Sequence, residues 1–340
     1  MNYPVFPDLL PANHTSYPNV TPSAFTTEQW LTYWQKLRVR GLEPTSAQRL
    51  RYVIRLISAE LGDIPLQNLN HQYVQCCIDT LLGQGISPRI VRSSMLYFSE
   101  AMDTARKRHL LGYNPCASMI LPTIVNPVRE AHLPYELTPL FEAATNTELE
   151  NLLPVAMYAA LRAGEVLALS WRQVDFRHKC IIVDQSYREY YNQEKQKIRE
   201  IRGNTKNGRH RTIYPPDCTF IYFERQKQRQ EIEFQKCGYT WQNSENLVFT
   251  TSEGSQISYP RLKYKFRKLC KAAGLPMLCF HDLRHTGAMI KYESTHDLWA
   301  VKDYLDHRFL GTTLRYINYN HIDENDIQKL EVFYGQFLKS

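Results

Sequence analysis

His-Asp-Leu-Arg-His at positions 281–285, Leu-Asp-His at positions 305–307 and Tyr316, nine residues beyond His307, decide what kind of fold this chain adopts. An arginine between two histidines, followed by a third histidine and a tyrosine, is an unusual group of side chains. Guanidinium stays charged and presents a planar fork to two oxygens, and a tyrosine becomes a nucleophile when a base or nearby cations favour its phenolate. The group therefore predicts a tyrosine that attacks a phosphodiester, with no metal involved.

Two cationic residues farther upstream belong with this group. Arg162 lies within residues 158–169, beside the apolar side chains of that helical stretch, and Lys206 precedes Asn207-Gly208. Taken singly, such an arginine is usually a surface residue and such a lysine is usually a solvated turn residue. A single tyrosine among 22 is equally uninformative.

The prediction depends on the whole set, because cleaving a phosphodiester without a metal has three requirements. Cations must stabilise the charge on the phosphorus, a nucleophile must be activated, and the leaving 5′-oxygen needs a proton, which a lysine of lowered pKa can give. The side chains that meet these requirements are Arg162, Lys206, His281, Arg284, His307 and Tyr316.

The chain divides into two domains, as its length of 340 residues allows. Apolar residues at helical spacing predict a small helical domain over residues 25–110. Several prolines with few periodic positions predict a linker over 111–136. A larger domain is expected over 137–322. The ends are predicted to be a flexible tail over 1–24 and a helix over 323–340.

Four helices are expected in the first domain. The first begins around Thr26–Glu28, Thr45-Ser46 caps the second, the third covers about 70–82, and the fourth runs from Ser87-Pro88 to about Leu110. In the third helix, the residues expected to face inward are Tyr73, Val74, Cys77 and Leu81. The basic run over 106–109 either complements the negative end of the fourth helix or faces phosphates.

The second domain is expected to be helical, with a small amount of strand. Cys180–Val183 predicts a short strand, and residues 198–205 and 210–214 flank Asn207-Gly208, a strong hairpin signal. The fold class is therefore mainly α with a small antiparallel β-sheet or hairpin.

Composition is compatible with nucleic-acid binding without requiring it. Lys and Arg number 41 against 34 Asp and Glu, which gives a net charge of +7. Eight cysteines form no Cys-x-x-Cys pair, so neither a zinc ribbon nor a redox dithiol is indicated. No membrane span or signal peptide is expected, and the predicted location is the cytoplasm, in association with the nucleoid.

Four segments, read together, resemble the tyrosine recombinase (phage integrase) family in order and approximate spacing. They are Leu161-Arg162-x-x-Glu165-x-x-x-Leu169-x-Trp171-x-x-x-Asp175, Thr205-Lys206-x-Gly208, His281-x-x-Arg284-His285 and Leu305-x-His307 followed by Tyr316. The resemblance covers about residues 25–325. It implies a helical core-binding (SAM-like) N-terminal domain followed by a tyrosine recombinase catalytic domain.

The resemblance also implies a role for each residue. Tyr316 would attack the scissile phosphate and form a 3′-phosphotyrosyl bond, while Arg162 and Arg284 clamp the non-bridging oxygens. His307 would add a hydrogen bond to the phosphate and His281 would accept the tyrosine proton. The remaining roles fall to Lys206, which would protonate the leaving oxygen, and Glu165, which would orient the site. Neither ATP nor a cofactor is implied.

The implied partners are duplex DNA, a homo-tetramer on synapsed DNA, and accessory factors that bend DNA or set direction. Whether residues 323–340 pack on their own domain or dock on a neighbouring protomer stays open. Two other functions are kept as alternatives, a type IB topoisomerase and a non-catalytic DNA-binding relative.

Several residue assignments also have rivals or departures. Tyr319 is a rival nucleophile to Tyr316, and arginines 202, 209 and 211 crowd Lys206 but do not readily release a proton. Ala160 and Asp306 stand where the family usually has glycine. We expect Asp306 to tolerate a positive φ and either to raise the pKa of His307 or to weaken contact with DNA.

Overall fold

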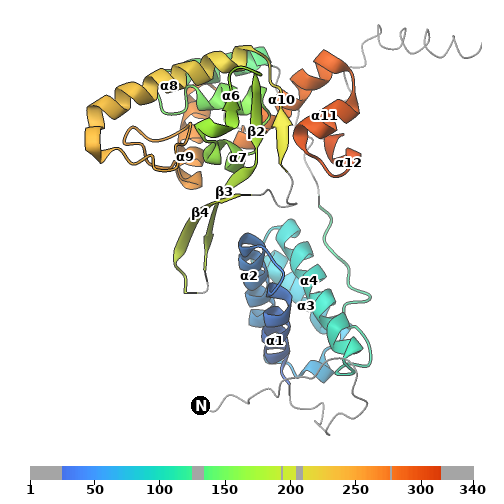
Figure 1. The fold of residues 1–340 in the computed structure, drawn as a ribbon. Helices are drawn as coiled ribbons and strands as arrows, with labels where there is room; N and C mark the ends of the chain where they lie inside the picture. The colour runs from blue at the N-terminus through green and yellow to red at the C-terminus, as the bar shows by residue number, and fades with distance from the viewer. Residues whose placement is uncertain (1–24, 125–133, 193, 204–209, 276–277, 315–340) are drawn as a thin grey trace, which may run out of the picture. The chain divides into compact units, whose positions relative to one another are not determined.

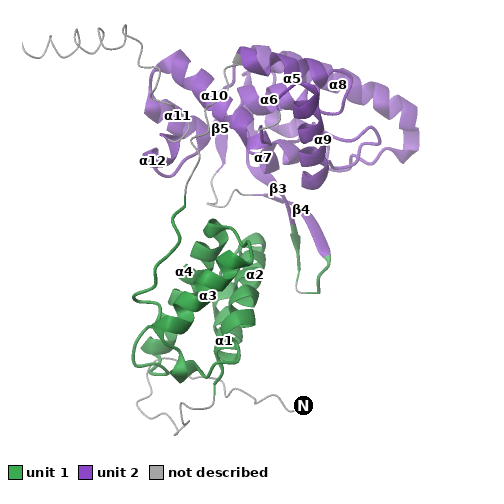
Figure 2. Cartoon of the chain, turned by 180° about the vertical axis from the view of Figure 1, so that it is seen from behind, with its two compact units in different colours: residues 1–127, 190–196 green, residues 128–189, 197–340 purple. Residues whose placement is uncertain are grey.

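The structure, a computed structural model, describes residues 25–124, 134–192, 194–203, 210–275 and 278–314 (Figure 1). The chain forms two compact units with separate cores (Figure 2). Unit 1 takes residues 1–127 and 190–196, and unit 2 takes residues 128–189 and 197–340. The domain boundaries expected from sequence remain a prediction.

Unit 1 is built from helices. They are α1 (Thr27–Val39), α2 (Pro44–Leu61), the short 3₁₀ helix η2 (Leu66–Asn68), α3 (His71–Gly83) and α4 (Pro88–Lys107). Helix α1 begins where predicted because Thr26 caps it. The Thr26 hydroxyl accepts from the Gln29 amide at 3.3 Å, and the Gln29 side chain accepts from the Thr26 amide at 3.0 Å.

Two predictions for this unit are wrong in detail. Thr45-Ser46 do not cap α2, because the helix already begins at Pro44. The fixed φ of proline suits the first turn of a helix. Tyr73 does not face inward, since it is 45% exposed. The buried stripe of α3 instead passes through Val74, Cys77 and Leu81, and Tyr73 lies one position off that stripe.

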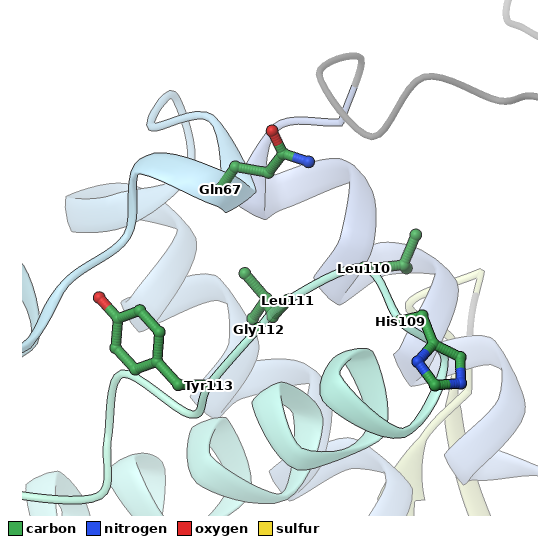
Figure 3. Close-up of a pocket in the computed structure, with 6 residues that line it drawn as sticks. All are labelled: Gln67, His109, Leu110, Leu111, Gly112 and Tyr113. Carbon is green, nitrogen blue, oxygen red and sulfur yellow. The ribbon is translucent and has the colours of Figure 1, made fainter.

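The segment after α4 packs against the unit 1 core. Cys116 is buried, and the Tyr113 hydroxyl donates to the Leu69 carbonyl at 3.3 Å. A surface pocket of ≈ 370 Å³ lies beside this segment (Figure 3). Its lining residues are Gln67, His109, Leu110, Leu111, Gly112 and Tyr113. Part of the predicted linker is therefore packed structure in residues 111–124.

Unit 2 is also mainly helical. Its α-helices are α5 (Thr138–Ala143), α6 (Leu152–Tyr158), α7 (Ala163–Ala168), α8 (Cys218–Cys237), α9 (Tyr259–Ala272), α10 (Phe280–Thr295), α11 (Leu298–Leu305) and α12 (Leu310–Thr313). Short 3₁₀ helices are η3 (Pro134–Leu137), η4 (Trp171–Gln173) and η5 (Gly238–Thr240). The predicted fold class, mainly α with small antiparallel sheets, is confirmed.

In the described residues, two small antiparallel sheets accompany these helices, and all their residues belong to unit 2 except the last two of β3. The strands are β1 (Val174–Asp175), β2 (Cys180–Val183), β3 (Gln185–Tyr191), β4 (Lys197–Gly203) and β5 (Arg211–Ile213). One sheet has the order β1-β2-β5 and the other pairs β3 with β4. The strand predicted at Cys180–Val183 is confirmed as β2.

The predicted hairpin around Asn207-Gly208 is wrong in its pairing. Strand β4 pairs with β3, and β5 pairs with β2, so the two segments that flank Asn207-Gly208 are not partners of each other. Ile213 of β5 lies opposite Ile181 of β2, and both side chains are buried. Burial of this apolar pair favours the long-range partner over the local one. Asn207 and Gly208 themselves lie outside the described residues.

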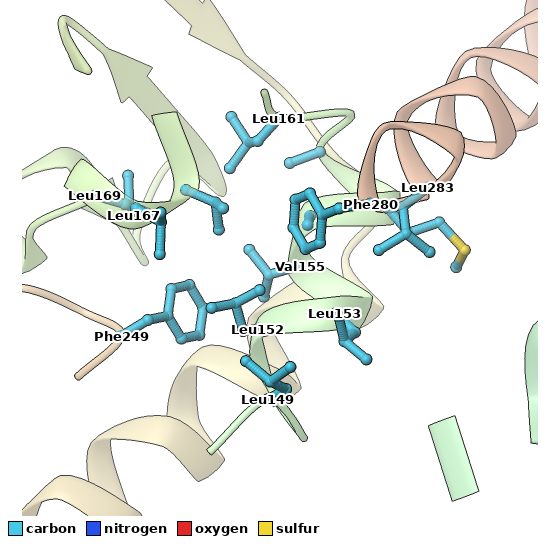
Figure 4. Packing of buried hydrophobic residues seen from close by; sticks show 14 of the residues in the cluster. Leu149, Leu152, Leu153, Val155, Leu161, Leu167, Leu169, Phe249, Phe280 and Leu283 are labelled. Carbon is cyan, nitrogen blue, oxygen red and sulfur yellow. The ribbon is translucent and has the colours of Figure 1, made fainter. Parts of the chain in front are cut away.

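The unit 2 core gathers around α6 and α7 (Figure 4). Leu152, Val155, Leu167 and Phe249 are fully buried there. The short helices α6 and α7 are almost wholly enclosed, so the loop between them, which ends at Arg162, is held by packing on both sides. This loop and α10 carry Arg162 and Arg284.

Helix α10 lies very close to the end of α6. A Cβ added to Gly287 would lie 2.1 Å from the Met157 carbonyl oxygen and 3.0 Å from the Ala160 Cβ. No residue larger than glycine fits there without a shift of backbone. Ala160 itself is buried and has a φ of 47°, in the left-handed region.

None of the helices in the part of the chain that the structure describes is both long enough and apolar enough to span a membrane.

Candidate active site

Arg162 stands at the N-cap of α7 and is held from several directions. Its amide donates to Glu165 Oε2 at 2.8 Å, and its Nη1 donates to Glu165 Oε1 at 2.8 Å. Its Nη2 donates to the carbonyls of Leu305 at 3.2 Å and Asp306 at 3.3 Å. The side chain is still 39% exposed, so the guanidinium keeps a solvent-facing side.

Arg284, on α10, is the second arginine and is 1% exposed. It donates through Nη1 to the Ala160 carbonyl and through Nη2 to the Leu305 carbonyl. The Leu305 carbonyl therefore accepts from both Arg162 and Arg284. This shared acceptor brings the two guanidinium groups together from residues 122 positions apart in sequence.

Glu165 is the anion beneath the two arginines. Its side chain is 2% exposed, and Arg284 Nη1 lies 3.9 Å from its Oε2. Burial alone would raise the pKa of this carboxyl. The hydrogen bonds and charges of Arg211, Arg162 and Arg284 outweigh burial, and the pKa falls to about 2. Glu165 is therefore ionised at neutral pH, as an orienting carboxylate needs to be.

Arg211, on β5, is a member of the cluster that the sequence did not reveal. Its Nη1 and Nη2 donate to Glu165 Oε1 and Oε2 at 2.9 and 2.8 Å, a bidentate pair. From sequence we considered it only as a rival to Lys206. The signal was indirect, because the arginine begins a strand whose other end, Ile213, is buried.

His307 follows α11 and is 8% exposed. Its Nδ1 lies 3.0 Å from the hydroxyl of Thr313, a buried residue of α12. Burial, then the charges of Arg284 and Arg162, lower the pKa of His307 to about 3. The imidazole is therefore neutral at pH 7.

Asp306 caps the C-terminus of α11 with a φ of 52°. The expectation that it tolerates a positive φ is confirmed. The expectation that its carboxylate raises the pKa of His307 is wrong, because burial and the nearby arginines lower that pKa instead. The carboxylate Oδ2 lies 3.8 Å from Arg162 Nη1.

His281 lies on α10, one turn before Arg284, and is exposed. Its ring packs edge to face on His285, with centroids 5.3 Å apart. Its charge is among the causes that lower the pKa of His307, which places it near the same site. Asp282 fixes the start of the helix, since its Oδ2 accepts from the Cys279 amide at 2.7 Å.

The structure thus brings together Arg162, Glu165, Arg284 and His307, with His281 beside them. Lys206 and Tyr316 lie outside the described residues, as does the predicted C-terminal helix over 323–340. Three guanidinium groups, the Glu165 carboxylate and the Asp306 carboxylate beside Arg162 leave a local charge of about +1 next to a neutral imidazole. Such a site suits an anion with several oxygens, a phosphate above all.

Comparison with known proteins identifies relatives over most of the chain. The family profile described as "Phage integrase family" matches residues 134–324. A "Tyrosine recombinase XerC-like" protein of Caldanaerobacter subterraneus subsp. tengcongensis is 26% identical over 279 residues, 78% of this chain and 70% of the relative. The "ICEBs1 integrase" of Bacillus subtilis is 24% identical over 83% of this chain and 75% of its own length.

Solved structures share the fold at lower identity. The Tn1549 transposon integrase in complex with a circular intermediate DNA superposes with a TM-score of 0.75 at 15% identity, over 91% of this chain and 100% of that one. A lambda integrase tetramer bound to a Holliday junction gives a TM-score of 0.64 at 16% identity, over 92% of this chain and 85% of that one.

Proposed function

This chain belongs to the phage integrase family and is a tyrosine recombinase that carries out site-specific DNA recombination, and we propose from that premise that Arg162 and Arg284 form its phosphate clamp. The observation that carries the proposal is the shared acceptor. Both guanidinium groups donate to the Leu305 carbonyl, two residues before His307. A scissile phosphate bound at Arg162 would therefore also lie close to Arg284 and to His307.

The proposed reaction proceeds through the tyrosine. The Tyr316 oxygen attacks the phosphorus, the bond to the 5′-oxygen breaks, and a 3′-phosphotyrosyl bond forms. His281 takes the tyrosine proton and Lys206 gives a proton to the leaving 5′-oxygen. The 5′-hydroxyl of the partner strand then attacks the phosphotyrosine and releases Tyr316, so the number of phosphodiester bonds is conserved.

His307 acts in this scheme as a neutral hydrogen-bond donor. Its low pKa, set by burial and by the two arginines, keeps a further positive charge from forming next to them. A neutral imidazole still donates one N–H to a non-bridging oxygen. The negative charge of the transition state is then stabilised mainly by Arg162 and Arg284, with Glu165 holding Arg162 in place.

We further propose duplex DNA as substrate and a homo-tetramer as the active assembly, with unit 1 as a second DNA-binding module. The Tn1549 and lambda integrase complexes with DNA support this assignment. The positive charge of +7 is consistent with it, and binding should weaken steeply with salt. Integration or excision of a mobile element in the cytoplasm, at the nucleoid, is the expected task.

A nicked suicide substrate tests the nucleophile directly. When the strand segment beyond the scissile phosphate is short, cleavage releases it as a fragment that carries the 5′-hydroxyl. This fragment diffuses away, and the covalent adduct accumulates. We expect the adduct with the natural chain and with Tyr319→Phe, the matched control, and no adduct with Tyr316→Phe. An adduct that persists in Tyr316→Phe and disappears in Tyr319→Phe would move the nucleophile to Tyr319.

A further inference from the structure

We propose that Arg211 is a positioning residue of the recombination site, which occupies the Glu165 carboxylate so that Arg162 remains available to the scissile phosphate. The inference rests on the proposed function, because it assigns Arg162 to the phosphate clamp. It concerns a side chain that lies on β5, outside the helices that carry the rest of the cluster.

The contacts divide the work between the two arginines. Arg211 gives one N–H to each oxygen of Glu165, at 2.9 and 2.8 Å. Arg162 gives a single guanidinium N–H to Glu165, from Nη1 at 2.8 Å, and directs Nη2 toward the Leu305 and Asp306 carbonyls. Arg211 thus makes the bidentate pair, and the Arg162 guanidinium makes a one-point contact, beside the separate bond from the Arg162 amide to Oε2.

Exposure separates their roles in the same way. The Arg211 side chain is 10% exposed, whereas that of Arg162 is 39% exposed. Both Nη atoms of Arg211 are directed at the ionised Glu165, which compensates the charge of Arg211, whereas the Nη atoms of Arg284 are directed at the neutral carbonyls of Ala160 and Leu305. Arg162 keeps a solvent-facing side through which it can bind a phosphate.

The physical reason is the demand of a buried carboxylate. Glu165 is 2% exposed, and an ionised carboxylate in that position needs both oxygens hydrogen-bonded. With Arg211 absent, each Glu165 oxygen would keep one hydrogen bond from Arg162, the amide on Oε2 and Nη1 on Oε1. A second guanidinium N–H that replaced the lost Arg211 contact would draw the Arg162 guanidinium inward. The positive charge would then be neutralised by Glu165 instead of facing the phosphate.

The test is a double-mutant cycle between Arg211 and Glu165. We expect Arg211→Gln to slow formation of the Tyr316 adduct on the order of 10²-fold at saturating protein, because a displaced clamp arginine is costly. Arg211→Lys keeps the charge without the fork and should lose less. Adding Glu165→Gln to Arg211→Gln removes the charge that draws Arg162 inward. The double variant should therefore form the adduct at least about tenfold faster than Arg211→Gln.

Arg261→Gln is the matched control for a purely structural effect. Arg261 forms an equivalent bidentate pair with the buried Glu148, at 2.9 and 2.7 Å, in the same unit but in a separate cluster. The Arg261→Gln substitution should lower the melting temperature. It should leave the rate of adduct formation by folded, DNA-saturated protein within about twofold of that of the natural chain.

The outcomes separate this inference from the function on which it rests. An Arg211→Gln rate equal to that of the natural chain, or a double variant no faster than Arg211→Gln, overturns the positioning role alone. A natural chain that forms no adduct at all overturns both. If Arg211→Gln does not fold, the rates of adduct formation by Arg211→Lys and by the double variant are compared with that of the natural chain. Equal rates for all three proteins also overturn the positioning role of Arg211.

Discussion

Two residues next to the arginine cluster adopt a backbone conformation that glycine would adopt more easily. Ala160 has a φ of 47° and presents its carbonyl to Arg284, and Asp306 has a φ of 52° at the end of α11. The left-handed conformation costs a residue with a Cβ on the order of 1 kcal/mol. The chain tolerates that strain in the two loops whose carbonyls hold the cluster together.

Asp306 should oppose phosphate binding at Arg162. Its carboxylate lies 3.8 Å from Arg162 Nη1, where it competes with a phosphate for the same cation. Asp306→Asn keeps the size of the side chain and its tolerance of positive φ, and removes the charge. We expect half-site affinity and cleavage rate to rise roughly fivefold, the equivalent of about 1 kcal/mol for a partly exposed charge. A binding titration and a suicide-substrate assay measure both quantities.

Asp303→Asn is the control for net charge. The Asp303 side chain is 78% exposed and pairs with Lys302, so removing its charge should change either quantity by less than about twofold. A loss of cleavage in Asp306→Asn would instead make the carboxylate a required part of the site.

At the scale of elements, helix α10 has to lie unusually close to the end of α6. Gly287 makes that approach possible, and the same approach carries Arg284 to the Ala160 carbonyl. The helix start is fixed independently by Asp282, which caps it. The position of α10 is therefore set at both the cap and the crossing, and the arginine lies between these two constraints.

Gly287→Ala should disturb both stability and catalysis. The added Cβ would lie 2.1 Å from the Met157 carbonyl oxygen, which belongs to backbone and cannot rotate away. We expect a loss of about 1–3 kcal/mol in the free energy of unfolding and slower adduct formation as Arg284 moves. Urea unfolding and the suicide-substrate assay are the measurements. Gly83→Ala, in the last turn of α3 with nothing within 4 Å, is the control and should be neutral or slightly stabilising. Equal effects of the two substitutions would contradict the close approach.

Elements were predictable from sequence where their signals are local. The cap at Thr26 and the apolar run of β2 both identified their elements correctly. The hairpin at Asn207-Gly208 was wrong because strand partners are chosen by burial at long range. Ile213 finds Ile181 in the core, and no turn signal reports that choice.

At the scale of the whole molecule, the arginine cluster lies in one of the two units. Each unit has its own apolar core, and every described member of the arginine cluster belongs to unit 2. The cluster buries charge, so the stability of this unit depends on pH. Glu165 and His307 both bind protons less readily in the folded state than in the unfolded chain.

The free energy of unfolding should therefore fall as pH decreases. The unfolded chain takes up protons at His307 from about pH 6.5, whereas the folded chain does so only near 3. Glu165 acts in the same direction between about 4.5 and 2. Each proton taken up only by the unfolded chain lowers stability by up to about 1.4 kcal/mol per pH unit. Urea unfolding at about pH 7.5, 5.5 and 4.5 measures the slope.

His307→Gln isolates the upper part of this dependence. The variant has no imidazole to protonate, so its stability should change less than that of the natural chain between about pH 6.5 and 4.5. Identical slopes for the two proteins would show that His307 titrates normally in the folded state.

The sequence by itself determined the family and the helical character of both units, and it singled out Arg162, Arg284 and His307 as a group, because those signals are motifs and local periodicities. Only the tertiary structure decided that Arg211 completes the cluster, that β5 pairs with β2, and that Asp306 faces Arg162. The reason is distance along the chain. Arg211 meets Glu165 across 46 positions and Arg162 meets Leu305 across 143, and contacts of that kind are set by how the core packs.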